Sequence, residues 1–231
     1  MNGLFSINSP LWSISSKALN FLWLSILWLV CSLPVVTIGA STSALYSITL
    51  KYVRNEEGYL TASFFTAFRQ NLRQGAIIWL VLLLAGLFLG LDFVFYYRGE
   101  QTGIGYMILM TLFFSLTLVF VLMNLYVYAV LAKFQNSVFH IIKSSCIMAL
   151  CHWPSSLAML MLSLLILAVG FLAFPPLLFF APAGLCYMHS KFLCRIFDGT
   201  SQPDAITHLE CRQRIRICRH LLILSMVFSL C

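Results

Sequence analysis

The chain has 231 residues, of which 61% are hydrophobic types and only 9% are charged, with a formal net charge of +7. Soluble domains carry roughly 45–50% apolar and about 25% charged residues, so this composition excludes an ordinary water-soluble fold. The excess of Lys and Arg indicates anchoring at the cytoplasmic side of a membrane. No soluble aromatic and basic platform accompanies it, so we expect the lipid bilayer as a partner and no nucleic acid.

Five long apolar segments follow one another along the chain. A membrane-spanning helix needs about 20 apolar residues to cross a hydrocarbon core of about 30 Å. Such segments run over residues 17–38, 75–97, 104–132, 155–174 and 177–195. The sequence therefore predicts an all-α, polytopic helical bundle with about five transmembrane helices. We expect one membrane domain over residues 1–198 and a basic tail over residues 199–231. Residues 1–16 contain no Lys or Arg, so we do not expect a secretory signal peptide.

The connections between these segments differ in charge. Twelve Lys and Arg residues fall on one side if residues 51–74, residues 133–154 and the end of the chain lie together, and only Lys17 and Arg98 remain for the other side. The positive-inside rule then predicts a multi-pass protein of a bacterial plasma membrane, with its N-terminus outside and its C-terminus in the cytoplasm. If residues 34–52 re-enter the membrane and the first segment does not cross it cleanly, the N-terminus could lie on the other side of the membrane.

The stretch SLPVVTIGASTSA, residues 32–44, interrupts the first apolar segment. Proline frees a carbonyl group, glycine permits unusual backbone angles and close approach, and hydroxyl side chains bond freed backbone groups. One interpretation is a broken helix that lines a ligand site, as in transporters. The favoured interpretation is a helix end and a tight packing seam. The residues of interest are Pro34, Thr37, Gly39, Ser41 and Thr42.

Two stretches between the spans have the pattern of amphipathic cytoplasmic helices. In residues 61–73, three phenylalanines recur at helical spacing and arginines occupy other faces. We expect this helix to lie on the membrane surface or to pack on its own protein; the alternative is docking on a partner. The residues of interest here and in the loop before it are Glu56, Glu57, Gly58, Tyr59, Phe64, Phe65, Phe68, Arg69 and Arg73. The second stretch is residues 136–151, with Val138, Ile141, Ser145 and Ala149 as its buried stripe.

No group of residues with a recognisable chemistry emerges. The sequence contains no H-E-x-x-H, no G-x-S-x-G and no P-loop, so we expect no catalytic residues and no cofactor. In the tail, His208, Cys211, Cys218 and His220 have a spacing that fits no zinc pattern, so no metal is expected. Within the spans, Asp92 lies close enough to the outer end to reach Arg98. Asn124 lies deeper and is expected to link helices by hydrogen bonding.

Three stretches together resemble one known family. Residues 29–50 read LVCSLPVVTIGASTSALYSITL, residues 52–75 read YVRNEEGYLTASFFTAFRQNLRQG, and residues 134–154 read FQNSVFHIIKSSCIMALCHWP. These motifs, in this order, resemble the YesL family of bacterial integral membrane proteins over about residues 15–198. No catalytic residues are established for that family, so the resemblance assigns none to this chain. Members are often encoded beside carbohydrate importers of the ATP-binding-cassette type, which implies an accessory role in sugar uptake by association alone.

Two functions therefore stay open. The first is a non-enzymatic accessory or regulatory protein that associates with a carbohydrate importer of the ATP-binding-cassette type. The second is a small transporter in its own right, built on the broken first helix. A transporter should bring polar residues from several spans together in mid-membrane, whereas an accessory subunit should present a large surface at lipid depth without a cavity.

Overall fold

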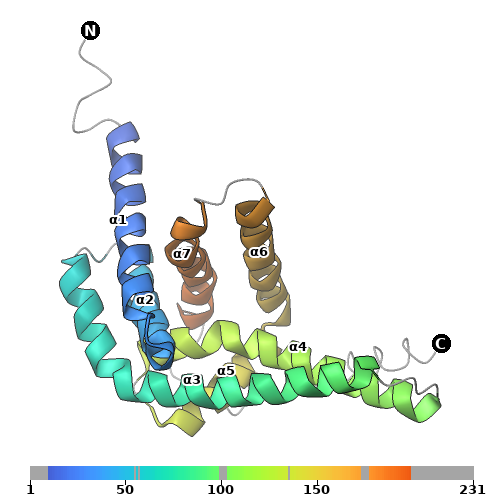
Figure 1. Ribbon diagram of the computed structural model, residues 1–231. Helices are drawn as coiled ribbons and strands as arrows, with labels where there is room; N and C mark the ends of the chain where they lie inside the picture. Colours follow the sequence, from blue (N-terminus) through green and yellow to red (C-terminus); the bar gives the residue numbers. More distant parts are fainter. Residues whose placement is uncertain are drawn as a thin grey trace.

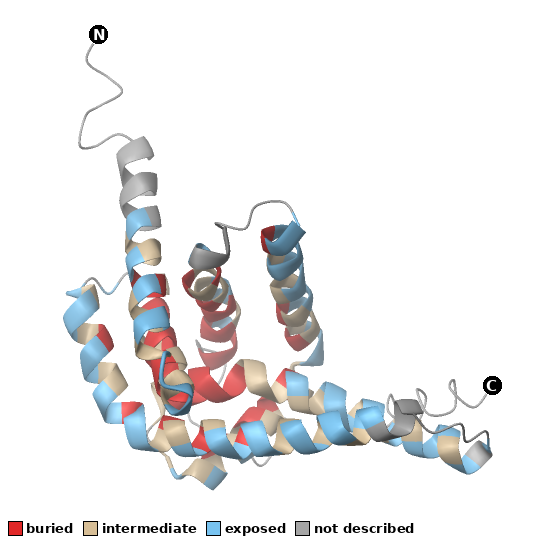
Figure 2. Cartoon of the chain, in the orientation of Figure 1, coloured by how far each residue is buried: buried red, intermediate tan, exposed pale blue. Residues whose placement is uncertain are grey.

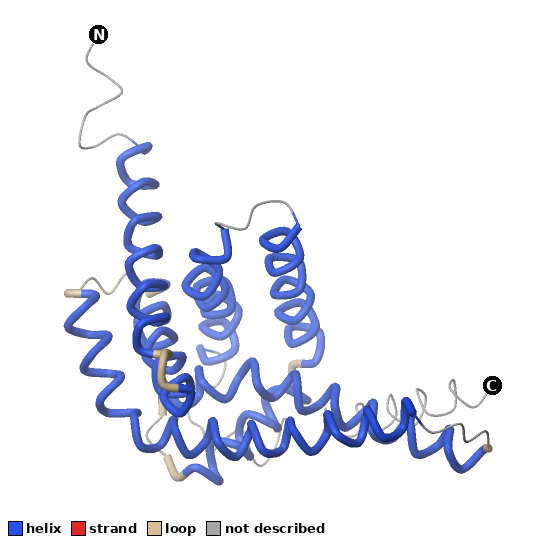
Figure 3. Tube along the Cα trace, viewed as in Figure 1, coloured by secondary structure: helices blue, strands red, loops and turns tan. Residues whose placement is uncertain are grey.

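The computed structural model describes residues 10–54, 56, 58–98, 103–134, 136–172 and 177–198, and all its regular elements are helices. Figure 1 shows their order and Figure 3 the short loops between them. The helices are α1 (Pro10–Cys31), α2 (Ile38–Val53), α3 (Leu60–Arg98), α4 (Ile104–Lys133), α5 (Val138–Cys151), α6 (Trp153–Leu172) and α7 (Leu177–Asp198), with a 3-10 turn η1 (Val35–Thr37) before α2. The all-α prediction is confirmed.

The helices form two groups. Helices α1, α2, α6 and α7 stand beside one another, while most of α3 runs together with α4 as a long arm that extends away from them (Figure 1). Helix α2 packs on α3, α4 and α7, and α5 packs on α4. Buried residues gather where α2, α4 and α7 meet, and exposed residues cover the far part of the arm (Figure 2). The largest fully buried side chains include Leu45, Phe64, Tyr126, Ile141, Met159 and Leu193.

Three helices in the described part of the chain are long and apolar enough to cross a membrane. They are Leu60–Val94, Gly105–Lys133 and Trp153–Leu172, which overlap most of the second, third and fourth spans expected from the sequence. Their apolar windows are almost entirely unburied within the protein. Large apolar side chains that face outward along these helices need hydrocarbon around them. The prediction of a helical membrane bundle is thereby confirmed.

Helices α1 and α2 form a hairpin, which differs from the clean first crossing that the sequence predicted. The rings of Phe21 and Tyr52 lie 5.5 Å apart, and Trp28 Nε1 donates to Thr42 Oγ1 at 3.1 Å. Residues 38–53 thus return alongside α1. The 16 residues of α2 measure about 24 Å, less than the roughly 30 Å of a hydrocarbon core. The geometry favours the re-entrant path that the sequence left open.

Helix α3 is continuous, although we expected a separate amphipathic helix at residues 61–73. It runs for 39 residues from Leu60 to Arg98, which is about 58 Å. The expected boundary marked a change in hydropathy, but no proline stands there, and the single glycine, Gly75, costs a helix only about 1 kcal/mol. Backbone hydrogen bonding therefore continues from the polar part into the apolar part. Figure 1 shows that the helix bends, so that its first turns rise beside α1 while the remainder runs with α4.

Helix α5 agrees with the second amphipathic helix expected from the sequence. It covers Val138–Cys151 and buries Ile141, Ser145 and Ala149 of the expected stripe, together with Met148. Val138 is only partly buried but packs against the core. Lys143 is exposed, as expected for a residue that faces headgroups or water.

Candidate functional site

The turn between α1 and α2 satisfies the backbone groups that Pro34 leaves unpaired. The Thr37 hydroxyl lies 2.7 Å from the carbonyl oxygens of both Cys31 and Pro34 and shares its proton between them. The backbone N–H of Thr37 also donates to the Pro34 carbonyl at 2.9 Å. A helix end within a membrane needs such partners, because unpaired backbone groups are costly in hydrocarbon. The turn is thus closed by its own groups.

Hydroxyl groups of α2 hold it to α1. Ser32 and Ser41 hydroxyls lie 2.7 Å apart, and Thr42 accepts from the indole N–H of Trp28. Both α2 hydroxyls also approach the carbonyl of Ile38, at 3.0 Å and 2.7 Å. Each of the polar residues that the sequence singled out in this stretch therefore has a partner within the hairpin. Such an arrangement serves packing and does not aim polar atoms at a ligand.

Gly39 sits at a close crossing of α2 and α3. A Cβ atom placed on Gly39 would lie 2.3 Å from the Gly75 carbonyl oxygen and 2.8 Å from Trp79 Cβ. A Cβ atom on Gly75 would lie 2.8 Å from the Ala40 backbone nitrogen. Backbone atoms cannot move aside as a flexible side chain can, so both positions require glycine. Small residues at a helix crossing let membrane helices approach closely. This crossing brings the first two sequence motifs into contact.

The beginning of α3 has a buried face and an exposed face. Phe64 is fully buried and stacks on Phe68, with ring centroids 6.4 Å apart. Trp23 of α1 donates to the Thr61 hydroxyl at 3.1 Å. Two of the three phenylalanines that the sequence assigned to a surface or docking role therefore pack within the protein. The self-packing that we favoured accounts for them.

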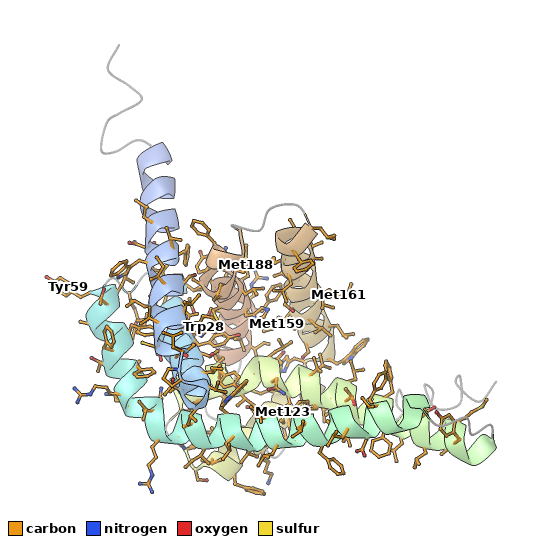
Figure 4. The ribbon with its side chains drawn as sticks, in the orientation of Figure 1. Trp28, Tyr59, Met123, Met159, Met161 and Met188 are labelled. Atoms are coloured by element: carbon orange, nitrogen blue, oxygen red, sulfur yellow. The ribbon has the colours of Figure 1, made fainter. Side chains whose placement is uncertain are left out.

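The opposite face of these turns is exposed, and we call it the outer face of α3. It consists of Tyr59, Phe65, Arg69 and Arg73. Tyr59 is 89% exposed and Phe65 is 44% exposed. Figure 4 shows Tyr59 projecting away from the body of the protein at the start of α3. In the loop before it, Glu56 and Gly58 are exposed, while Glu57 lies outside the described residues.

A cluster of buried polar side chains joins α2 and α7, and the sequence analysis missed it. Tyr46 OH lies 3.1 Å from His189 Nδ1, and His189 Nε2 lies 3.3 Å from the carbonyl oxygen of Met159. A carbonyl only accepts, so His189 carries its proton on Nε2 and accepts from Tyr46 through Nδ1. One turn further along, the hydroxyls of Thr49 and Ser190 lie 2.8 Å apart. We call Tyr46, Thr49, His189 and Ser190 the buried polar cluster.

A weak signal for this cluster existed in the sequence. Tyr46 and Thr49 are three residues apart on α2, and His189 and Ser190 are neighbours on α7, so each pair can reach one side of its helix. Asn124 donates to the Phe120 carbonyl of its own helix at 2.8 Å, so the expected link between helices is wrong. Asp92 Oδ2 is buried without a hydrogen-bond partner among the described residues, and the Arg98 side chain lies outside them.

An apolar groove of about 650 Å³ runs between α3 and α4 in the arm. Its walls include Gly86, Gly90 and several phenylalanines. The two hydroxyls in it belong to Thr111 and Thr117, and each is bonded at 2.9 Å to a carbonyl of its own helix. A sugar needs placed donors and acceptors to be held in one orientation. The groove therefore suits hydrocarbon and not carbohydrate.

No group of three or more His, Cys, Asp or Glu residues within the described ranges could hold a metal ion. His208, Cys211, Cys218 and His220 of the tail lie outside those ranges, as does the whole of residues 199–231.

Comparison with known proteins returned two matches. Residues 21–93 match a family described as protein of unknown function, DUF624. This range contains the first motif, most of α3 and the Gly39–Gly75 crossing. The chain is also 24% identical over 192 residues to the uncharacterized protein YesL of Bacillus subtilis (strain 168), which covers 83% of this chain and 88% of that protein. No solved structure matches. Together with the three motifs, these matches support the resemblance of the chain to the YesL family.

Proposed function

We propose that the protein is a non-enzymatic accessory or regulatory subunit of the bacterial plasma membrane that associates with a carbohydrate importer of the ATP-binding-cassette type. The observation that carries the proposal is the outer face of α3. It combines two exposed aromatic side chains with two arginines, and the opposite face of these turns packs against the protein. Aromatic residues and Arg are enriched where proteins bind partners.

Anchoring does not account for the outer face. The first turns of α3 are already held by buried Phe64, by Phe68 and by the bond between Trp23 and Thr61. Tyr59 takes no part in this packing, and Phe65, which packs edge to face on Phe64 with ring centroids 5.9 Å apart, still leaves 44% of its surface exposed. The choice of a sugar importer as the partner rests on the family resemblance, which is an argument by association.

Exchanging Arg69 and Arg73 for Ala should lower the recovery of importer subunits with the protein after mild solubilisation. The thermal unfolding midpoint should stay within about 2 °C of the wild type, because changes at exposed positions cost within roughly 0.5 kcal/mol. Affinity purification from the native host, followed by identification of importer subunits, measures the recovery. Lys143→Ala, an exposed cation on α5, is the matched control. If the wild-type protein recovers no importer subunit, the proposal fails.

A small transporter is the second function to test, because the buried polar cluster joins polar groups from different helices. Against it, these groups pair with one another, and the groove of the arm offers no unbonded hydroxyl. Purified protein in proteoliposomes distinguishes the two functions. Saturable uptake of a labelled sugar without any other protein would favour the transporter.

We further propose that Lys51–Arg54, the end of α4 and the end of α7 face the cytoplasm, since twelve of the fourteen Lys and Arg residues fall in residues 51–74, residues 133–154 and the chain from residue 191 onward. Because α2 returns alongside α1, the beginning of α1 lies on the same side of the hairpin turn as Lys51. The hairpin therefore favours a cytoplasmic N-terminus over the external one expected from the sequence.

A single Cys at position 56, in a chain without other Cys, should resist a membrane-impermeant thiol reagent in intact cells. A single Cys at position 103 should react. Both positions are exposed, so the difference reports the side of the membrane. The Glu56→Cys chain should react in inverted vesicles, which controls for accessibility. Reaction of Glu56→Cys from outside intact cells would reverse the orientation.

A further inference from the structure

The ends of three helices meet around a small pocket of about 180 Å³. Lys51 and Arg54 line it from the end of α2, Lys133 from the end of α4, and Phe197 from the end of α7. Glu56 contributes a carboxylate. We call this site the basic pocket. Its cations come from two regions about 80 residues apart in the sequence, which the positive-inside rule independently places on the cytoplasmic side.

Among the described residues, three cations and one carboxylate line the basic pocket. Lys51 and Arg54 are exposed, so a ligand can reach them from water. The Ser47 hydroxyl also lines the pocket, 3.4 Å from the Ala132 carbonyl oxygen.

Helix electrostatics explain part of this arrangement. Cations near the C-terminal ends of helices interact favourably with the helix dipole. The Lys133 ammonium lies 4.2 Å from the ring centroid of Phe197 and 5.3 Å from that of Phe134. A cation–π contact holds the ammonium in place by electrostatic attraction to the ring face. These effects explain the position of Lys133 in the lining of the basic pocket. They do not explain why a pocket opens between cations of α2 and α4.

We propose that the basic pocket binds a phosphate group, either the headgroup of an anionic phospholipid or a soluble phosphate ester. Guanidinium and ammonium groups are the side chains that recognise phosphate, Arg by paired hydrogen bonds and Lys as a point charge. The volume is below the roughly 300–1,000 Å³ of sites that enclose drug-sized ligands. It therefore suits one phosphate-sized anion and not a whole oligosaccharide. This site does not depend on the importer proposed above.

The test uses the purified full-length protein and two probes. The first probe is phosphatidylglycerol in phosphatidylcholine nanodiscs, compared with nanodiscs of phosphatidylcholine alone. The second is glycerol 3-phosphate, added to protein in phosphatidylcholine nanodiscs. The thermal unfolding midpoint is measured as each probe is titrated. We expect a saturable rise with at least one probe. In Arg54→Gln and Lys51→Gln, the concentration for half the effect should rise about tenfold, which corresponds to the loss of one charge-assisted contact.

Lys143→Gln is the control, since it removes the same charge from an exposed position of α5 outside the pocket. A rise with phosphatidylglycerol alone identifies a lipid headgroup as the ligand, and a rise with glycerol 3-phosphate identifies a soluble ester. If neither probe shifts the midpoint, or if Lys143→Gln weakens the effect as much as the pocket variants do, the proposal is overturned. Should Arg54→Gln fail to fold, the result for Lys51→Gln, a change at an exposed position, decides.

Discussion

Gly39→Ala should destabilise the protein by roughly 1–3 kcal/mol, the usual cost of an added carbon in a packed interior. For a chain of this length the thermal unfolding midpoint should fall by about 2–12 °C. The added Cβ would meet the Gly75 carbonyl oxygen at 2.3 Å, and a backbone group can give way only if α2 and α3 separate. Thermal unfolding in detergent measures the change.

Gly90→Ala is the matched control for the crossing. Gly90 lies in the apolar part of α3, and a Cβ placed there meets no atom within 4 Å. Alanine favours a helix over glycine by about 1 kcal/mol, so this variant should be neutral or slightly stabilised. Equal midpoints for the two variants would show that the helices do not cross at Gly39.

His189→Ala should lower the free energy of unfolding by roughly 2–4 kcal/mol, which is the second large effect that we expect. The change empties buried volume and leaves the Tyr46 hydroxyl and the Met159 carbonyl without their partner. Figure 4 places Met159 between α6 and α7, so the loss should loosen α6 as well. The free energy of unfolding in mixed micelles, measured by titration with a denaturing detergent, records the cost.

His140→Ala provides the comparison for His189. His140 also pairs with a hydroxyl, that of Ser144 at 3.3 Å, but it is only partly buried on α5. Water can replace that partner, so the free energy of unfolding of this variant should fall by less than about 1 kcal/mol. Tyr46→Phe, which leaves His189 Nδ1 unpaired, should fall between the two. A cost for His189→Ala no larger than that for His140→Ala would mean that the buried polar cluster contributes nothing to the fold.

The sequence predicted features that are set by local chemistry. Pro34 and the residues after it predicted a helix end and a tight seam, because proline and glycine restrict or free the backbone wherever they stand. The break, the hydroxyl partners and the close crossing all lie in that stretch. The identity of the crossing helix was not predictable, since nothing local connects Gly39 with Gly75.

Features set by tertiary contacts escaped the sequence analysis. Tyr46 and His189 are 143 positions apart, and no periodicity relates them. We expected two helices in place of α3 because the hydropathy of the sequence changes there. Hydropathy decides whether a helical segment faces water or lipid, but it does not end the helix. Phe64 and Phe65 are adjacent in an aromatic run, yet one is fully buried and the other is exposed. The packing of neighbouring helices, mainly α2, against α3 separates their roles.

The continuity of α3 has a mechanical consequence. One unbroken run of backbone hydrogen bonds joins the exposed face at its beginning to the lipid-facing arm at its end. Between these two parts, α3 is in close contact with α2 at Gly39 and Gly75. Apolar helices change their tilt when bilayer thickness changes. Because the helix is continuous, we expect a change in the tilt of the arm to shift Tyr59 and Arg69, and with them the surface proposed for a partner.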